Sequence, residues 1–488
     1  MERLSKQIVD KNSYSEKVVQ FGEGNFLRAF VDWQIDVMNK ADLFNGSIVV
    51  VQPIEHGLTE LLDQQDGLYT LILEGIKEGK AVREKEIINS ISRTINPYQD
   101  KEAFFALAKQ PELAFVFSNT TEAGIVFEET DIQTDRLPRT FPGKLTAFLY
   151  ERYLHFHADM TKGLAIIPCE LIDRNGDQLK ACIEKYIDLW ALPAAFLDWL
   201  NHANQFCCSL VDRIVPGYPR DQATKIEHEL GYHDQLMVVA EHYHLWVIEG
   251  DAELAAKFPA NQIGLNTLFV EDLAPYRTRK VHILNGSHTA LTPIAYLMGL
   301  NTVEEAIKNE KISQFLKQMI NEEVIPSLPY DQSDLKAYTE TVLERFENPY
   351  LKHQLMSIAL NSVSKFATRD LPILLRYYEK TGALPEKLVF ALAALLYFYD
   401  GKRGNETIAL NDDPEILERF QKWWKTYDGS LESAHYLVSH ALRKTKWWGQ
   451  DLTKLEGLVK QVAEHLMRID TNGIALALDH ILEVKDHA

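Results

Sequence analysis

Apolar residues in the first half of the chain gather in short runs that alternate with amphipathic segments. Runs rich in Val, Ile and Phe are typical of buried strands, and the apolar spacing over 26–40 predicts a helix directly after the first run. Strands that alternate with helices form βαβ units, so the pattern predicts an α/β domain with a mostly parallel sheet. The expected strands cover residues 17–21, 47–52, 113–119 and 163–168, with further ones at 209–216 and 266–273.

The pattern changes after about residue 276, where convincing strand runs stop and helical segments such as 303–324 take over. We therefore expect an α/β domain over 1–276 and a mainly α-helical domain over 277–488. The most apolar run, LVFALAALLYFY at 388–399, has only 12 residues. Because a membrane span needs about 20, this run predicts a buried helix and no membrane partner.

The composition is that of an ordinary globular protein, since 46% of the 488 residues are hydrophobic and 25% are charged. The formal net charge of −19 opposes binding to nucleic acid, which requires clustered Lys and Arg. The four cysteines form no C-x-x-C pair, and the N-terminal segment has no apolar signal region. Together these features predict a cytoplasmic protein.

A glycine pair follows the first expected strand, in the stretch VVQFGEGNFLRAF at 18–30. In a dinucleotide-binding turn the first glycine permits the tight bend and the second lets the backbone approach a pyrophosphate. Gly22 and Gly24 fit these roles. Leu27 stands where the usual third glycine would be, so a plain turn between strand and helix stays an alternative.

The residue that ends the second expected strand bears on the choice of cofactor. An acidic side chain there usually binds the ribose hydroxyls of the adenosine, whereas this chain has the neutral Gln52. No Lys or Arg follows closely, which argues against a 2′-phosphate and favours NAD over NADP.

Lys280, Asn285 and His288 lie in the segment RKVHILNGSHTAL at the expected domain boundary. On one α-helix they would fall within an arc of about 140° with His288 in the middle. Alternatively, Lys280 lies at or before the helix start, with Asn285 and His288 one turn apart. A lysine, an amide and an imidazole that face one pocket suit proton transfer to or from a carbonyl or alcohol. A surface lysine, a capping Asn and a core histidine are the structural alternative.

Polar clusters also follow later expected strands. In FSNTTEAGI, the side chains of Asn119, Thr120 and Glu122 come where open α/β sheets bind ligands, although this cluster equally suits a helix N-cap. The segment CCSLVDRIVP carries Asp212 next to Arg213, which is more often a structural ion pair than a binding site.

These segments, in this order, resemble the long-chain polyol-specific dehydrogenases, the family that contains mannitol dehydrogenases and hexuronate reductases. The catalytic signature of that family is a Lys, four residues, an Asn, two residues and a His, and KVHILNGSH matches it. GEGNFLRA matches the family's G-x-G-x-F-x-R-A turn, TEAG its T-E-x-G segment and VDRIV its V-D-R-I segment. The match covers nearly the whole chain.

The resemblance implies a Rossmann-type domain that binds NAD over 1–276, a helical substrate and catalytic domain over 277–488, and no catalytic metal. It implies that Lys280 is the general acid or base, that Asn285 stabilises the alkoxide and that His288 orients the sugar. It places the cofactor on Phe21, Gly22, Gly24, Asn25, Phe26, Gln52, Asn119, Thr120 and Glu122. It places the substrate on Asp212, His353 and Lys365.

Within the family the segments are most similar to those of hexuronate reductases. This similarity implies reduction of a keto-hexuronate in hexuronate catabolism, with D-tagaturonate as the favoured substrate. Two departures from polyol-oxidising members suit an acidic substrate: Leu171, after Glu170, replaces an Asn, and Ser357 replaces an Arg. The substrate carboxylate requires a cation, and the cations nearby in sequence are Lys352, His353, Lys365 and Arg369.

Other functions stay open at this point. A fructuronate reductase or a mannitol dehydrogenase of the same family would share the three catalytic residues. A non-catalytic NAD(H)-binding regulator is an alternative of another class. A zinc hydrolase is a poorer one, because the sixteen histidines contain no H-x-x-x-H pair. The sequence does not settle the oligomeric state.

Overall fold

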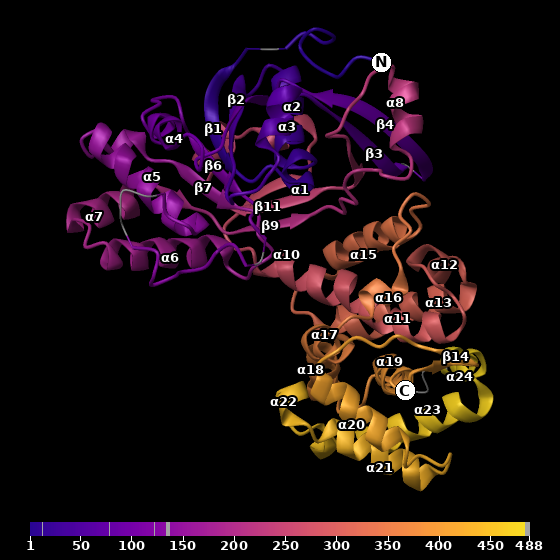
Figure 1. Cartoon of the computed structure of the whole chain (residues 1–488). Helices are drawn as coiled ribbons and strands as arrows, with labels where there is room; N and C mark the ends of the chain where they lie inside the picture. Colours follow the sequence, from indigo (N-terminus) through magenta and orange to yellow (C-terminus); the bar gives the residue numbers. More distant parts are fainter. Residues whose placement is uncertain (12, 78, 122, 133–136, 484–488) are drawn as a thin grey trace. The chain divides into compact units, whose positions relative to one another are not determined.

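The computed structural model describes residues 1–11, 13–77, 79–121, 123–132 and 137–483 (Figure 1). It divides the chain into two compact units, one of Met1–Lys77 with Val82–Ala274 and one of Glu78–Ala81 with Pro275–Ala488. The first unit is α/β and the second is mainly helical, which confirms the predicted fold class. No helix among the described residues is long and apolar enough to span a membrane.

A six-stranded parallel sheet forms the centre of the first unit. Its order, β5-β2-β1-β6-β7-β8, corresponds to the order 3-2-1-4-5-6 of a Rossmann fold. The order reverses between β1 and β6, so the carboxyl ends of these strands form the point where such sheets bind ligands. The strands are β1 (Ser15–Phe21), β2 (Gly46–Val51), β5 (Ile91–Ile95), β6 (Phe115–Ser118), β7 (Ala165–Pro168) and β8 (Gln205–Phe206).

Alternate residues of these strands belong to two cores, one on each face of the sheet. Val19 of β1 and Val49 of β2 lie in the core that includes the apolar residues of four helices. Val18 and Ile48 lie in the opposite core, with α2 (Val31–Lys40) and a smaller sheet. Because both faces are covered, β1, β2, β6 and β7 contain the apolar runs from which strands were predicted. The strands β5 and β8, which were not predicted, contain polar residues. The four helices are α4 (Lys101–Ala108), α5 (Phe141–His155), α6 (Asn175–Leu189) and α7 (Ala194–Ala203).

Two three-stranded sheets complete the first unit. The runs at 209–216 and 266–273 do contain strands, but these pair with β11 outside the main sheet, and β9 is antiparallel to β11. One small sheet consists of β9 (Ser209–Asp212), β11 (Leu245–Glu249) and β12 (Thr267–Val270). The other consists of β3 (Tyr69–Lys77), β4 (Lys80–Ile88) and β10 (Val238–Glu241). The remaining helices are α1 (Asn25–Arg28), α3 (Thr59–Gln64), α8 (Ala223–Leu230), α9 (Ala252–Lys257), η1 (Met160–Lys162) and η2 (Ala260–Ile263).

The prediction of one continuous helix over 26–40 is wrong. The α1 helix ends at Arg28 and α2 begins at Val31, because the backbone of Phe30 leaves the helical region at φ −133° and ψ −72°. Phe30 is fully buried, and its ring centroid lies 5.4 Å from that of Trp246. We attribute the break to this packing, since burial of a Phe side chain contributes about 2 kcal/mol, more than one helical hydrogen bond.

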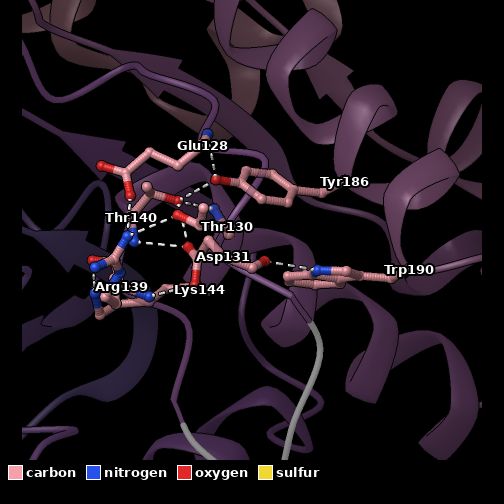
Figure 2. A network of polar contacts seen from close by, with 9 residues as sticks. Glu128, Thr130, Asp131, Arg139, Thr140, Lys144, Tyr186 and Trp190 are labelled. Carbon is pink, nitrogen blue, oxygen red and sulfur yellow. Dashed lines mark hydrogen bonds and ion pairs between the residues drawn. The ribbon is translucent and has the colours of Figure 1, made fainter.

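A polar network fixes the start of α5 against α6 (Figure 2). The carboxylate of Asp131 accepts hydrogen bonds from the backbone N and from Oγ1 of Thr140, both at 2.9 Å. Thr140 is the N-cap of α5, and its hydroxyl also lies 2.8 Å from the hydroxyl of Tyr186 in α6. Trp190, at the end of α6, donates its Nε1–H to the backbone O of Asp131 at 2.9 Å. These bonds tie together two helices that cover one face of the sheet.

Asn175, the first residue of α6, connects the carboxyl end of β7 to β9. Its Nδ2 lies 3.0 Å from three backbone carbonyl oxygens, those of Pro168, Glu170 and Ser209. Its Oδ1 accepts from the backbone N–H groups of Ser209 and Gly176, both at 2.9 Å. Asn175 is 1% exposed, so water cannot replace the hydrogen bonds of its side-chain amide if they are lost.

We expect Asn175→Asp to destabilise the first unit strongly. A carboxylate of the same shape cannot donate to the three carbonyl oxygens, and the lost bonds and repulsion should cost about 3 kcal/mol or more. Thermal unfolding followed by circular dichroism should show a Tm several degrees lower than that of the wild type. Asn201→Asp, on the exposed surface of α7, is the matched control; an equal fall in Tm for the two variants would contradict this reading.

The second unit packs its helices around α19 (Glu386–Phe398), which contacts α11 and α23. This helix contains most of the run at 388–399 and is buried along nearly its whole length, as predicted. The helices are α10 (Ala274–Arg279), η3 (Lys280–Asn285), α11 (Gly286–Leu297), α12 (Val303–Lys308), α13 (Glu310–Gln318), η4 (Met319–Val324), α14 (Ile325–Ser327), α15 (Gln332–Phe346), α16 (Leu355–Ile358), α17 (Ser362–Arg369), α18 (Leu371–Thr381), α19, α20 (Pro414–Trp424), α21 (Leu431–Leu442), α22 (Thr445–Trp448), η5 (Leu452–Lys454), α23 (Leu458–Asn472) and α24 (Ile474–Glu483), with a short hairpin of β13 (Lys402–Arg403) and β14 (Glu406–Thr407).

Candidate active site

The glycine turn joins β1 to α1 at the carboxyl end of the central sheet. Gly22 has a φ of +123°, and a Cβ on it would lie 3.1 Å from the backbone O of Asn119 and 3.1 Å from Cδ1 of Leu27. Glycine suits this position both for its conformation and for the close approach. A Cβ on Gly24 would meet no atom within 4 Å among the described residues beyond its chain neighbours. The turn therefore has little room for a side chain at Gly22, whereas the described residues leave the space beside Gly24 free.

Arg28 holds this turn in place. Its Nε donates to the backbone O of Glu23 at 3.1 Å, and its Nη2 donates to Oδ1 of Asn25 at 2.8 Å. The guanidinium lies 5.1 Å from the centroid of the Tyr69 ring, and burial lowers its pKa. Leu27, at the place of the third glycine, is 1% exposed and packs into the core.

The two expected phenylalanines differ in their surroundings. Phe21 is fully buried, with its ring centroid 5.0 Å from that of Phe141, so its side chain belongs to the core. Phe26 is partly exposed and stacks on Phe30 at 5.0 Å.

Gln52 closes the loop that follows β2. Its Nε2 donates to the backbone O of Ile54 at 2.9 Å and of Glu55 at 3.0 Å, and its Oε1 accepts from Oγ1 of Thr59 at 2.7 Å. A cavity of about 700 Å³ lies beside this loop and the carboxyl end of β5. Its polar lining includes Gln52, Glu55, His56, Glu60, Asp63 and Asn96.

A buried carboxylate organises the carboxyl ends of β6 and β7. Glu170 is 2% exposed, and it accepts hydrogen bonds from Oγ of Ser118 at 3.0 Å and from the backbone N and Oγ1 of Thr120 at 2.9 Å. Burial raises its pKa. Asn119 donates its Nδ2–H to the backbone O of Cys169 at 2.9 Å. Asn119 and Thr120, which the sequence indicated as ligand-binding residues, thus hold the loop beside Gly22 in place. Glu122 lies outside the described residues.

Asp212 ends β9, Arg213 follows it, and both residues are buried. The Arg213 guanidinium donates to the backbone O of Glu241 at 2.8 Å and of Ala29 at 2.7 Å, and it lies 4.2 Å from the ring centroid of Trp33. Burial lowers the pKa of Arg213 to about 9. Arg213 therefore has a structural role: it binds two backbone carbonyl groups and stacks on an aromatic ring.

Lys280, Asn285 and His288 share one helical segment, which runs from α10 through η3 into α11. Lys280 is consequently not at a helix start. It begins η3, a π-helical turn that Asn285 ends. Because hydrogen bonds in a π-helix join residues five apart, Lys280 and Asn285 lie about one turn apart on the same side. Such turns are frequent at functional sites.

His288 lies one α-helical turn beyond Asn285, in a cluster of rings and cations. It is 8% exposed, and its ring centroid lies 4.4 Å from that of Phe346 and 5.1 Å from that of His353. Burial lowers its pKa well below the ordinary value, and positive neighbours add to this effect. These neighbours are His353, Arg345, Arg369 and Lys365.

Two cations of α17 complete this cluster. Burial lowers the pKa of His353, and the positive charge of Lys365 lowers it further. The ammonium group of Lys365 donates a hydrogen bond to the backbone O of Ile358 at 2.7 Å. Arg369 donates its Nη1–H to Oγ1 of Thr289 at 3.0 Å, next to His288 in α11. The second unit therefore brings together Asn285, His288, His353, Lys365 and Arg369, whereas Lys352 and Ser357 are exposed.

Sequence reasoning missed Arg345 and Phe346, at the end of α15, which carry no motif of their own. Among residues 1–483, apart from those outside the described ranges, no group of three His, Cys, Asp or Glu side chains could hold a metal ion.

Family models match both parts of the chain. The model of the mannitol dehydrogenase Rossmann domain matches residues 16–262, and that of the mannitol dehydrogenase C-terminal domain matches residues 272–470. The protein is an oxidoreductase that acts on CH–OH groups. It belongs to the mannitol dehydrogenase family, as the motifs implied.

Two of the curated proteins to which the chain is similar are altronate oxidoreductases. That of Bacillus subtilis (strain 168) is 50% identical over 480 residues, 98% of each chain. That of Escherichia coli O1:K1 / APEC is 48% identical over 479 residues, 98% of this chain and 99% of the relative.

Two solved structures share the fold of this chain at low sequence identity. The mannitol 2-dehydrogenase of Pseudomonas fluorescens, in a ternary complex with NAD and D-mannitol, aligns with a TM-score of 0.71 and 22% identity, over 99% of this chain and 100% of that one. A D-sorbitol dehydrogenase in substrate-free form aligns with a TM-score of 0.80 and 22% identity, over 98% and 100%.

Proposed function

We propose that this protein reduces D-tagaturonate to D-altronate with NADH and catalyses the reverse oxidation with NAD. The observation that carries the proposal is the π-helical turn, which sets Lys280 and Asn285 on one side of a helix, one turn before His288. The altronate oxidoreductases at 48–50% identity over nearly the full chain support the choice of substrate.

The first unit has residues that fit a nicotinamide dinucleotide. The open backbone at Gly24 suits a pyrophosphate, and Gly22, with its positive φ, sets the turn. The cavity beside β2 is lined by Glu55, Glu60 and Asp63, whose negative charges would repel a 2′-phosphate. Arg93 also lines it, but its guanidinium is paired with Glu16 at 2.7 Å, so NAD is favoured over NADP. When bound, NADH supplies the hydride of the reduction. We assign the cofactor to 1–276 and the substrate to 277–488.

The proton chemistry belongs to the helical segment. Lys280 donates the proton that the ketone oxygen gains and takes it back in the oxidation. Asn285 donates a side-chain N–H to the same oxygen as negative charge develops on it. His288, neutral because of its lowered pKa, exchanges hydrogen bonds with a sugar hydroxyl. His353 and Lys365 bind the remaining polar groups of the substrate.

The neutral state of His288 predicts a particular dependence of stability on pH. Its folded-state pKa lies below the unfolded value of about 6.5, so between the two the unfolded chain binds the proton and stability falls with falling pH. We expect the Tm of the wild type to fall more steeply from pH 7 to pH 5 than that of His288→Gln. Parallel Tm curves for the two proteins would contradict a buried neutral imidazole.

Oxidation of the alcohol tests the proposed function directly. NAD reduction, followed at 340 nm, should be rapid with D-altronate and at least about tenfold slower in kcat/KM with D-mannitol or with NADP in place of NAD. Preference for mannitol would make the protein a mannitol dehydrogenase. Tight NADH binding without turnover of any substrate would indicate a regulator.

A further inference from the structure

Lys365 and Arg369 lie four residues apart on α17, which places both cations on one face of the helix. Both side chains are partly buried, and burial lowers the pKa of each, with a further contribution from their mutual repulsion for Lys365. Neither forms an ion pair with a carboxylate among the described residues. Asp412 acts on the pKa of Lys365 less than burial and Arg369 do, and its carboxylate accepts a hydrogen bond from the hydroxyl of Tyr399. Two neighbouring half-buried cations without an ion-paired carboxylate are costly unless an anion joins them.

Arg369 is fixed to the helical segment that carries the proposed catalytic residues. Its Nη1 donates to Oγ1 of Thr289 at 3.0 Å and lies 3.5 Å from the backbone O of Asn285. Its own backbone O lies 2.5 Å from Nδ1 of His282 in the π-helical turn. The guanidinium is thus held against the turn through one nitrogen, and its Nε and Nη2 form no hydrogen bond to any described residue.

The neighbouring acid, Asp370, interacts electrostatically with Arg369 but forms no ion pair with it. Asp370 is 1% exposed, and burial raises its pKa well above the ordinary value, which favours its neutral form. Its Oδ1 faces the backbone of α11, where a Cβ on Gly286 would lie 2.8 Å away. Its Oδ2 has no hydrogen-bond partner among the described residues.

We propose that Arg369, assisted by Lys365, binds the carboxylate of the sugar-acid substrate and selects it over neutral ketoses. The inference rests on the proposed reduction of a keto-hexuronate. The Nε–Nη2 edge of a guanidinium matches the two oxygens of a carboxylate in a planar, bidentate pair. Lys365, one turn earlier on the same face, adds a second positive charge to the same anion.

The test compares Arg369→Met and Arg369→Lys with the wild type in the reduction of D-tagaturonate by NADH. We expect Arg369→Met to raise KM for D-tagaturonate by about 30-fold or more, with kcat and KM for NADH changed by less than about threefold. Arg369→Lys keeps the positive charge but lacks the planar guanidinium with its two parallel N–H donors, so its KM for D-tagaturonate should be intermediate. Reduction of D-tagatose, the neutral ketose that lacks the carboxylate, should be no slower in Arg369→Met than in the wild type.

Arg376→Met, on the exposed side of α18, is the charge-matched control and should behave as the wild type. A purely structural role of Arg369 would lower kcat for both substrates and alter KM for NADH, and that result would overturn the inference. Unchanged kinetics in Arg369→Met and Arg369→Lys, with an active wild type, would also overturn it and leave the proposed function intact. A wild type that does not reduce D-tagaturonate would instead remove the proposed function, and this inference with it.

Discussion

Replacement of Lys280 by Met is expected to lower kcat for the reduction of D-tagaturonate by a factor of about 10²–10⁴. The ketone oxygen gains negative charge as it is reduced, and without Lys280 only water remains to protonate it. Methionine keeps an unbranched side chain of similar length, so the π-helical turn should fold. Steady-state kinetics at pH 7 with saturating NADH and D-tagaturonate measure the effect, and Tm reports the folding.

Lys317→Met, at an exposed position of α13, provides the control and should keep wild-type kcat. If Lys280→Met retained most of the wild-type kcat at neutral pH, Lys280 would not be the acid. A loss of activity that followed a large fall in Tm would instead place Lys280 among the structural residues.

Gly22→Ala and Gly24→Ala are expected to differ in how they weaken NADH binding. Alanine at position 22 meets a φ of +123° and a backbone oxygen at 3.1 Å, a strain of about 1–3 kcal/mol. That variant should lose both thermal stability and affinity for NADH, the latter by about tenfold or more. Gly24 has φ −70° and open space around its Cβ position, so Gly24→Ala should keep its Tm and weaken only NADH binding.

Isothermal titration with NADH and thermal unfolding together separate the two effects. Wild-type affinity for NADH in both variants would show that the turn does not receive the cofactor. Equal losses of Tm would contradict the difference in backbone conformation at the two positions.

The sequence revealed those parts of the fold that are buried on both sides. The strands β1, β2, β6 and β7 each contain an apolar run because helices or sheets cover both faces. By contrast, β4 reads KAVREKEII, and five of its nine residues are charged because most of the strand is partly exposed. Its pattern resembles a surface segment, so it was not predicted. The break at Phe30 also escaped prediction, since it results from packing against Trp246, far away in sequence.

The candidate site was predicted through motifs, and its geometry was not. A five-residue spacing between Lys280 and Asn285 is awkward on an α-helix, and only the π-helical turn explains it. Nothing in the local sequence predicts that turn. Likewise, the hydrogen bonds that engage Gln52 and Thr120 depend on residues brought close by folding. Arg369 appeared in sequence only as one cation among four, and its contact with Thr289 distinguishes it.

The most direct test of the central claim is oxidation of NADH by the purified protein with D-tagaturonate beside D-fructuronate. The account predicts kcat/KM for D-tagaturonate at least about tenfold higher than for D-fructuronate, with D-altronate as the product and a loss of this activity in Lys280→Met. A preference for D-fructuronate, or no NADH oxidation with either keto-hexuronate, would contradict it.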